Sequence, residues 1–308
     1  MKITVIGAGL MGHGIAQIFA ARGHPVCLVD MNAEVLASAK DRIQANLTQL
    51  AEHGLADRKA IPENLARITL MPDHATACRE ADVVFEAVTE DLELKQRLFA
   101  EIDRVSPERA ILCSCTSVMS ITQIAAQARR RERILGTHFW NPPYLIPLVE
   151  VIRTEHTAAR CMAEVYDLLE AAGKRPVRVE KDVPGFVGNR LQHALWREAF
   201  ALIDEGICDA ATVDLVVKQS FGLRLPVLGP VVNADLVGLD LTLAIHDYIL
   251  KHLSASPTPS ATLRAKVAQG QLGFKTKSGF LEWTDGEMAA TREQLVTHLL
   301  ETLSRRRS

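Results

Sequence analysis

The chain has 308 residues, of which 48% are hydrophobic and 23% are charged, and its formal net charge is −2. This is the composition of a globular protein long enough for two domains, and it gives no indication of a nucleic-acid or membrane-surface partner. The first predicted strand begins at residue 2 and no apolar run reaches membrane-spanning length, so we expect neither a signal peptide nor a membrane anchor. The six cysteines show no metal-binding or disulfide spacing, which favours a reducing cytoplasm and predicts no metal site.

The first predicted element is a buried strand that runs into a glycine-rich turn. Residues 2–6 are rich in β-branched side chains, and a helix is predicted from Ile15 to Arg22. Between them Gly7, Gly9 and Gly12 form a G-x-G-x-x-G pattern that also contains Leu10 and Met11. In a dinucleotide-binding turn the first glycine permits the bend, the second lets the backbone approach a pyrophosphate, and the third lets the helix pack closely. The alternative is a glycine turn without a ligand in another α/β domain.

The second predicted strand, residues 25–29, ends in Asp30, which lies 18 residues after Gly12. A carboxylate at this position can accept hydrogen bonds from the ribose hydroxyls of adenosine and repels a 2′-phosphate. No arginine or lysine occurs in residues 31–33 to bind that phosphate. The sequence therefore predicts NAD(H) rather than NADP(H).

Two helical segments, residues 32–54 and 56–66, follow as an insertion, and strands then alternate with helices. This alternation predicts a doubly wound α/β sheet. The last predicted strand, residues 176–179, leads to a turn at residues 182–185, after which strand patterns largely disappear. We therefore expect a Rossmann-type NAD-binding domain at residues 1–184 and a mostly α-helical domain at residues 185–308. The arginine-rich run at residues 129–133 is expected to be a solvated face.

Two residues at the carboxyl edge of the predicted sheet suggest acid–base chemistry. His138 ends one strand, and Glu150 lies in the otherwise apolar strand that follows, at residues 148–152. A lone buried carboxylate is costly unless it is paired, and an imidazole partner would satisfy it, fix the ring tautomer and raise the histidine pKa. Such a pair is a general base for removing a hydroxyl proton. From spacing alone, a core histidine bonded to the backbone is an equal alternative.

Other polar residues follow neighbouring strands. The segment from Ser114 to Ser117 could bind a substrate oxygen or cap the next helix. Glu90 ends a strand and could pair with Lys95 over a nicotinamide ring, or form an ordinary ion pair. Asn189 lies in the first turn of the helix that opens the second half.

Together these segments resemble the 3-hydroxyacyl-CoA dehydrogenase family over nearly the whole chain. The resemblance rests on ordered motifs: G-A-G-x-M-G-x-G-I-A at the start, E-x-x-x-x-K at 90–95, S-x-T-S at 114–117, H-F-x-N-P at 138–142, L-V-E-V at 148–151 and D-x-P-G-F-x-x-N-R at 182–190. Gly-Leu-Asp at 238–240 and Lys-Ser-Gly-Phe at 277–280 follow in order.

The resemblance implies a specific reaction. It implies His138 as the base and Glu150 as its partner, with Ser117 and Asn189 as substrate and transition-state contacts and Glu90 as a carboxylate near the cofactor. It further implies NAD-dependent oxidation of the 3-hydroxyl of a 3-hydroxyacyl-CoA, a CoA contact through the helices at residues 32–66, and a homodimer.

Some positions depart from the family pattern and leave the substrate open. Cys115 stands where many members have asparagine, Trp140 precedes the motif asparagine, and residues 224–230 replace a characteristic proline-containing stretch. The paired prolines after Asn141 are similar to those of relatives that act on free hydroxy acids, such as gulonate, carnitine and pyridine-carboxylate dehydrogenases. In that case Arg224 could bind a free carboxylate, or it could be a surface arginine. A structural role like that of the lens crystallins of this family is a second alternative.

Overall fold

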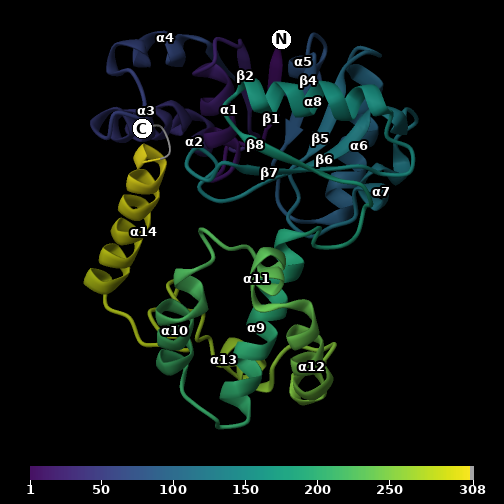
Figure 1. Ribbon diagram of the computed structural model, residues 1–308. Coiled ribbons are helices and arrows are strands. Elements are labelled where there is room, and N and C mark those ends of the chain that lie inside the picture. The colour runs from purple at the N-terminus through teal and green to yellow at the C-terminus, as the bar shows by residue number, and fades with distance from the viewer. Residues whose placement is uncertain (306–308) are drawn as a thin grey trace. The chain divides into compact units, whose positions relative to one another are not determined.

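The computed structural model describes residues 1–305, and within them a single sheet of eight strands forms the first part of the chain (Figure 1). Its strand order is β3-β2-β1-β4-β5-β6-β7-β8, and the strands from β3 to β6 are parallel. β7 runs antiparallel to β6 and parallel to β8. The predicted doubly wound sheet is confirmed. The strands are β1 (Ile3–Ile6), β2 (Val26–Val29), β3 (Ile68–Met71), β4 (Val83–Glu86), β5 (Ile111–Ser114), β6 (Ile134–Phe139), β7 (Leu148–Ile152) and β8 (Arg175–Val179).

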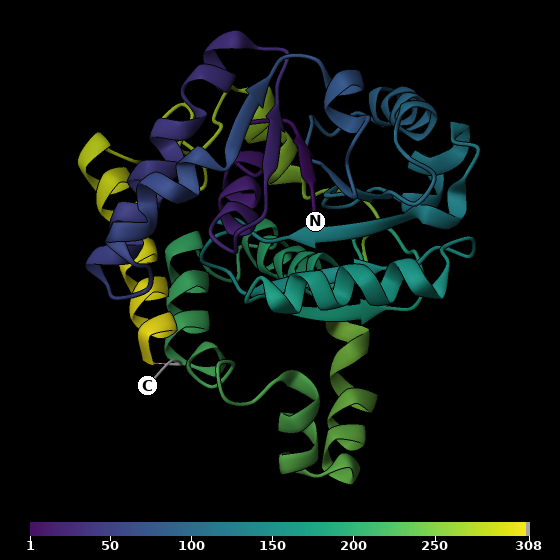
Figure 2. The same cartoon turned by 90° about the horizontal axis from the view of Figure 1, so that it is seen from above.

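Helices cover both faces of this sheet, because alternate side chains of each strand point to opposite faces. One apolar cluster joins the sheet to α1, α3 and α8, and the other joins it to α5, α6 and α7. Helix α8 packs along β7 and β8 (Figure 2). The helices of this part are α1 (Gly12–Ala20), α2 (Ala33–Ala37), α3 (Ala39–Glu52), α4 (Ile61–Ala66), α5 (His74–Cys78), α6 (Leu92–Val105), α7 (Ile121–Ile124) and α8 (Ala159–Ala171).

The inserted helical segment differs from its prediction at one point. Asn32 caps the segment as expected, since its side-chain oxygen accepts hydrogen bonds from the backbone N–H groups of Glu34 and Val35. The expected single helix is divided into α2 and α3 at Ser38. The Ser38 hydroxyl donates a hydrogen bond to the Val35 carbonyl, and such bonds from serine to the backbone compete with helix continuation.

The second part of the chain is helical, as predicted. Its helices are α9 (Gly188–Asp204), α10 (Ala210–Gln219), α11 (Pro230–Val237), α12 (Leu239–Ile249), α13 (Ala261–Ala268) and α14 (Asp285–Arg305). Gly238, whose φ of 101° ends α11, separates α11 from α12. No helix in residues 1–305 combines the length and apolar character that a membrane span requires.

The chain forms two compact units, and helix α14 contributes to both. One unit contains residues 191–294, and the other contains residues 1–190 together with the chain from Leu295 onward. In the latter unit Leu300 is buried against Leu55 and Leu145. Helix α14 was not among the predicted elements. The boundary at residues 184 and 185 stays a prediction.

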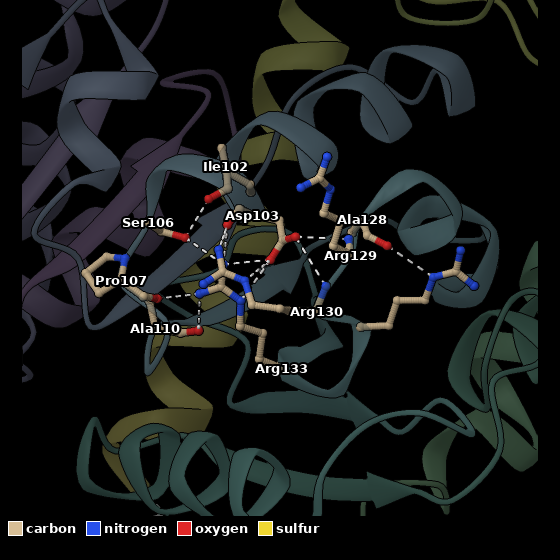
Figure 3. A network of polar contacts seen from close by, with 10 residues as sticks. Ile102, Asp103, Ser106, Pro107, Ala110, Ala128, Arg129, Arg130 and Arg133 are labelled. Carbon is tan, nitrogen blue, oxygen red and sulfur yellow. Dashed lines mark hydrogen bonds and ion pairs between the residues drawn. The ribbon is translucent and has the colours of Figure 1, made fainter.

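The arginine-rich run is not the solvated face that we expected, because Arg133 is 1% exposed. Its guanidinium donates to the Asp103 carboxylate (2.7 Å), the Ser106 hydroxyl (3.1 Å) and the Ala110 carbonyl (3.0 Å) (Figure 3). Arg130 donates to the same carboxylate. Burial works to raise the pKa of Asp103, but the hydrogen bonds it accepts outweigh burial and lower that pKa. A buried carboxylate requires such partners, so this part of the run is structural.

Candidate active site

The glycine-rich turn lies at the carboxyl edge of the sheet, between β1 and β4, where the strand order changes direction. Gly7 has φ of 99°, and a Cβ atom there would lie 2.5 Å from the Ala87 carbonyl oxygen. A Cβ at Gly12 would overlap the Gly7 carbonyl. The fold therefore requires both glycines. A Cβ at Gly9, by contrast, would meet no atom within 4 Å, so the space above Gly9 is open. Such space is what close approach of a pyrophosphate needs.

Asp30 holds the turn from the neighbouring strand. Its Oδ2 accepts a hydrogen bond from the Ala8 N–H (2.8 Å), and its Oδ1 accepts one from the Asn32 N–H (2.8 Å). Each carboxylate oxygen keeps a lone pair that a ribose hydroxyl can use. Of the other predicted turn residues, Leu10 is 64% exposed and Met11 is half-buried directly before α1. The acceptor oxygens of Asp30 and the open space above Gly9 fit a dinucleotide.

Two residues that sequence reasoning missed also hold the turn. His13 is buried, and its Nδ1 lies 2.6 Å from the Gly9 carbonyl oxygen. Arg42 of α3 donates to the Ala8 carbonyl (2.9 Å). Burial lowers the pKa of His13, and the Arg42 guanidinium lowers it further, against the hydrogen bond to Gly9. A neutral ring with Nδ1–H donating to Gly9 follows. Arg42 follows His13 by 29 positions in the sequence, which explains why no local pattern indicated that both residues hold the same turn.

The predicted pair of His138 and Glu150 meets across the antiparallel strands β6 and β7. The two residues are direct partners in the strand register. The distance from His138 Nδ1 to Glu150 Oε2 is 2.7 Å, and the residues are 3% and 1% exposed. Glu150 Oε1 accepts two further hydrogen bonds, from the N–H groups of Val187 (2.8 Å) and Gly188 (3.0 Å). Each fixed donor holds the carboxylate in one orientation.

These contacts define the chemistry of the histidine. Burial works to raise the pKa of Glu150, but the hydrogen bonds from His138, Gly188 and Val187 outweigh it and lower that pKa. An ionised carboxylate can only accept, so Nδ1 of His138 carries a proton and Nε2 has a free lone pair. The imidazole is flanked by the rings of Trp140 and Phe186, with centroids 5.1 and 5.8 Å away. This arrangement can accept a proton at Nε2.

The structure contains the predicted ion pair of Glu90 and Lys95, but Lys95 has a closer partner. Lys95 is 1% exposed, and its Nζ donates to Oε1 of Glu86 at 2.6 Å and to the Val88 carbonyl at 3.3 Å. Glu90 is a more distant partner, with its Oε2 at 3.6 Å. Glu86 is fully buried and also accepts from the Ser114 hydroxyl (2.7 Å). Sequence reasoning missed Glu86 as the main partner of Lys95.

Glu90 also joins the segment after β5. Its carboxylate accepts from the Thr116 hydroxyl (2.8 Å) and from the Ser117 N–H (2.6 Å). The Ser117 carbonyl in turn accepts from Nδ2 of Asn189 (2.7 Å), which is 8% exposed. The structure thus connects Glu90, Ser117 and Asn189 through one series of hydrogen bonds. The Ser117 residue is exposed.

Two family models match almost the entire chain. Residues 2–183 match the NAD binding domain of 3-hydroxyacyl-CoA dehydrogenase, and residues 185–283 match the C-terminal domain of 3-hydroxyacyl-CoA dehydrogenase. The chain belongs to the 3-hydroxyacyl-CoA dehydrogenase family. It is therefore an NAD-dependent oxidoreductase of the type that acts on 3-hydroxyacyl-CoA or related hydroxy-acid substrates.

Individual relatives differ in their substrates. The human mitochondrial hydroxyacyl-coenzyme A dehydrogenase is 38% identical over 288 residues, which cover 91% of this chain and 90% of the relative. A 5-formyl-3-hydroxy-2-methylpyridine 4-carboxylate 5-dehydrogenase of Mesorhizobium japonicum is 32% identical and covers 97% of this chain and 96% of its own.

Solved structures show the same two kinds of relative. The crystal structure of a 5-dehydrogenase for that pyridine carboxylic acid matches with a TM-score of 0.90 and 31% identity, over 98% of this chain and 96% of its own. The (S)-3-hydroxybutyryl-CoA dehydrogenase from Ralstonia eutropha matches with a TM-score of 0.77 and 34% identity. The match covers 92% of this chain and 99% of that structure's chain.

Proposed function

We propose that this protein oxidises the 3-hydroxyl group of a 3-hydroxyacyl-CoA to the ketone, reversibly, with NAD as hydride acceptor. The observation that carries this proposal is the buried pair of His138 and Glu150, 2.7 Å apart. The pair is held by two strands in register, and its free Nε2 is suited to accept a hydroxyl proton.

Each group in the proposed reaction has a defined task. Nε2 of His138 accepts the proton of the 3-hydroxyl group, and the Glu150 carboxylate stabilises the resulting imidazolium through Nδ1–H. Ser117 and Asn189 are proposed to contact the substrate oxygen. Bound NAD supplies the acceptor for the hydride that leaves C3.

For the cofactor, we propose that Gly7, Gly9, Leu10, Met11 and Gly12 bind the pyrophosphate and that Asp30 binds the ribose. Glu90 is proposed to lie near the nicotinamide. Lys95 is too deeply buried for direct contact without rearrangement, and we propose that it acts through Glu86 and Glu90.

The first test compares His138→Asn with His156→Asn, a matched change at an exposed histidine. NADH formation is followed with 3-hydroxybutyryl-CoA. We expect His138→Asn to lower kcat by at least about 10²-fold with NAD still bound, and His156→Asn to have no effect. Near-normal turnover by His138→Asn would exclude the mechanism. A folded, NAD-bound protein inert to every hydroxy substrate would favour a crystallin-like role.

A second candidate is the oxidation of a free hydroxy acid. It is favoured by the TM-score of 0.90 with the pyridine-carboxylate dehydrogenase, whose match covers 98% of this chain. Arg224 is exposed and is the proposed carboxylate partner in this case. Parallel assays with 3-hydroxybutyryl-CoA and with free 3-hydroxybutyrate, gulonate and carnitine separate the candidates. Turnover of only a free acid, reduced by Arg224→Gln, would select the second.

We also propose that the helical domain, residues 185–308, forms a homodimer. Helix α11 carries exposed apolar side chains, with Val231 at 74% and Leu236 at 70% exposure. Such a face is typical of an interface. Light scattering of the wild type and of Val231→Asp tests it, since a monomeric wild type would contradict the proposal.

A further inference from the structure

Trp140 carries a buried hydrogen-bond donor that has no partner among the residues that the structure describes. Its indole Nε1 is buried, and no acceptor within residues 1–305 lies within hydrogen-bonding distance of it. Buried donors in native proteins nearly always have a partner, because an unpaired one destabilises the fold. The proposed mechanism does not use this group.

The position of Trp140 directly after β6 places its ring beside the candidate base. Trp140 follows His138 by two residues, and side chains two apart along an extended chain point to the same face. Their ring centroids are 5.1 Å apart, with 55° between the ring planes. Gly188 leaves the space that the indole occupies, since a Cβ atom there would overlap Cζ2 of Trp140.

The Glu150 carboxylate, which is paired with His138, does not need the indole N–H as a further donor. Glu150 already accepts hydrogen bonds from His138, Val187 and Gly188. The indole N–H is therefore a fixed donor next to the imidazole that is not needed to hold the pair. Trp140 is also one of the positions at which this chain departs from the family motif.

We propose that Trp140 is a specificity-determining residue whose Nε1–H, which has almost no exposed surface in the substrate-free protein, becomes accessible on substrate binding and donates to an oxygen on C1 of the substrate. The acceptor is a carbonyl-type oxygen, either the thioester carbonyl of an acyl-CoA or the carboxylate of a free hydroxy acid. This inference rests on the proposed function, in which His138 binds the oxygen on C3. The C1 and C3 oxygens of one substrate are close enough to reach two adjoining rings.

The variant Trp140→Phe tests this, because it keeps an aromatic ring beside His138 and removes the donor, together with the part of the indole that packs against Gly188. We expect kcat/KM to fall about 10-fold for 3-hydroxybutyryl-CoA, mainly through KM, if the acceptor is a neutral carbonyl. We expect a fall of about 100-fold for 3-hydroxybutyrate if the acceptor is a carboxylate, because a charged acceptor forms a stronger bond. Turnover of a simple secondary alcohol, which lacks the C1 oxygen, should be unchanged. The matched control is Trp196→Phe at a residue that is 43% exposed.

The melting temperature of Trp140→Phe is measured to show that the variant is folded, because the smaller ring also leaves empty the space that the indole fills against Gly188. The reading that a purely structural role would not produce is a fall in kcat/KM with the hydroxyacyl substrate while turnover of the secondary alcohol stays unchanged. An unchanged kcat/KM of Trp140→Phe with both 3-hydroxybutyryl-CoA and 3-hydroxybutyrate would overturn the inference. An equal loss of kcat/KM with the secondary alcohol would also overturn it.

The proposed function can fail separately from this inference. A wild type inactive with both hydroxy compounds would refute the function. In that case the substrate-induced rise in melting temperature is compared for wild type and Trp140→Phe in the presence of NAD. A rise that the variant loses would support the inference, and the absence of any difference would overturn it.

Discussion

Replacing Glu150 with glutamine is the sharpest perturbation of the candidate pair, because it changes one oxygen to an NH₂ group with almost no change in shape. In the structure Glu150 Oε1 accepts from the N–H groups of Val187 and Gly188, and Oε2 accepts from Nδ1 of His138. Two fixed backbone donors require an oxygen at the first position. The amide nitrogen of the variant is therefore expected to face His138.

That orientation reverses the histidine tautomer. An N–H of the amide needs an acceptor, so Nδ1 of His138 must give up its proton, and the neutral ring then carries it on Nε2. A ring protonated at Nε2 cannot accept the substrate proton. In its active tautomer the variant lacks the charge-assisted bond of the wild type (~1.5–3 kcal/mol) and leaves a buried donor unpaired (~1–3 kcal/mol). The resulting cost of about 2.5–6 kcal/mol relative to the wild type corresponds to a fall in kcat of roughly 10²- to 10⁴-fold.

The assay is steady-state NADH formation with saturating NAD, together with a thermal melt to show that Glu150→Gln is folded. NAD affinity is expected to be unchanged, since no contact joins Glu150 to the glycine turn among the hydrogen bonds described for residues 1–305. If Glu150→Gln keeps kcat within about threefold of the wild type, the tautomer argument is wrong.

Three further changes test other parts of the structure. Gly9→Ala should leave the melting temperature unchanged but weaken NAD binding at least about 10-fold, measured by titration, whereas Gly12→Ala should destabilise the fold itself. Lys95→Met leaves the buried Glu86 carboxylate without its cation and should lower the free energy of unfolding, measured in urea, by about 3–5 kcal/mol. Lys2→Met, at the exposed pair with Glu80, should have a far smaller effect, and equal effects of the two variants would contradict this interpretation. Burial lowers the pKa of Lys174 from 10.5 to about 7. Between these pH values the unfolded state therefore binds more protons than the folded state. The unfolding free energy should rise with pH from about 7 to 10, and this gain from Lys174 should be gone once the pH has fallen through 7. Lys174→Met should abolish that slope.

Where a pattern is local, the sequence predicts the structure closely. The glycine turn, Asp30 at the end of β2 and the strands that carry His138 and Glu150 all follow from periodicity and spacing. These features depend on residues near one another in the chain, or on the rule that ligands bind at the carboxyl edge of a parallel sheet.

Contacts between distant segments could not be predicted in this way. Glu86 meets Ser114 because β4 and β5 are in register, and it meets Lys95 because α6 packs beside β4; no spacing in the sequence indicates either contact. The burial of Arg133 likewise depends on a contact between distant segments, since its partner Asp103 lies on α6, 30 residues away. Helix α14 did leave a signal: Val296, Leu300 and Leu303 recur at helical spacing and pack in one cluster.

The antiparallel step from β6 to β7 has a consequence for how such enzymes diversify. His138 and Glu150 are opposite each other by virtue of backbone pairing in the sheet, so the distance between them does not depend on the sequence of the loop at residues 140–147. That loop can change its side chains, or be exchanged with the loop of a relative, while the pairing of His138 with Glu150 stays intact. Under the proposed function, the residues for proton transfer and those for substrate preference therefore lie in separable parts of one hairpin, and selection or engineering can alter the second without rebuilding the first.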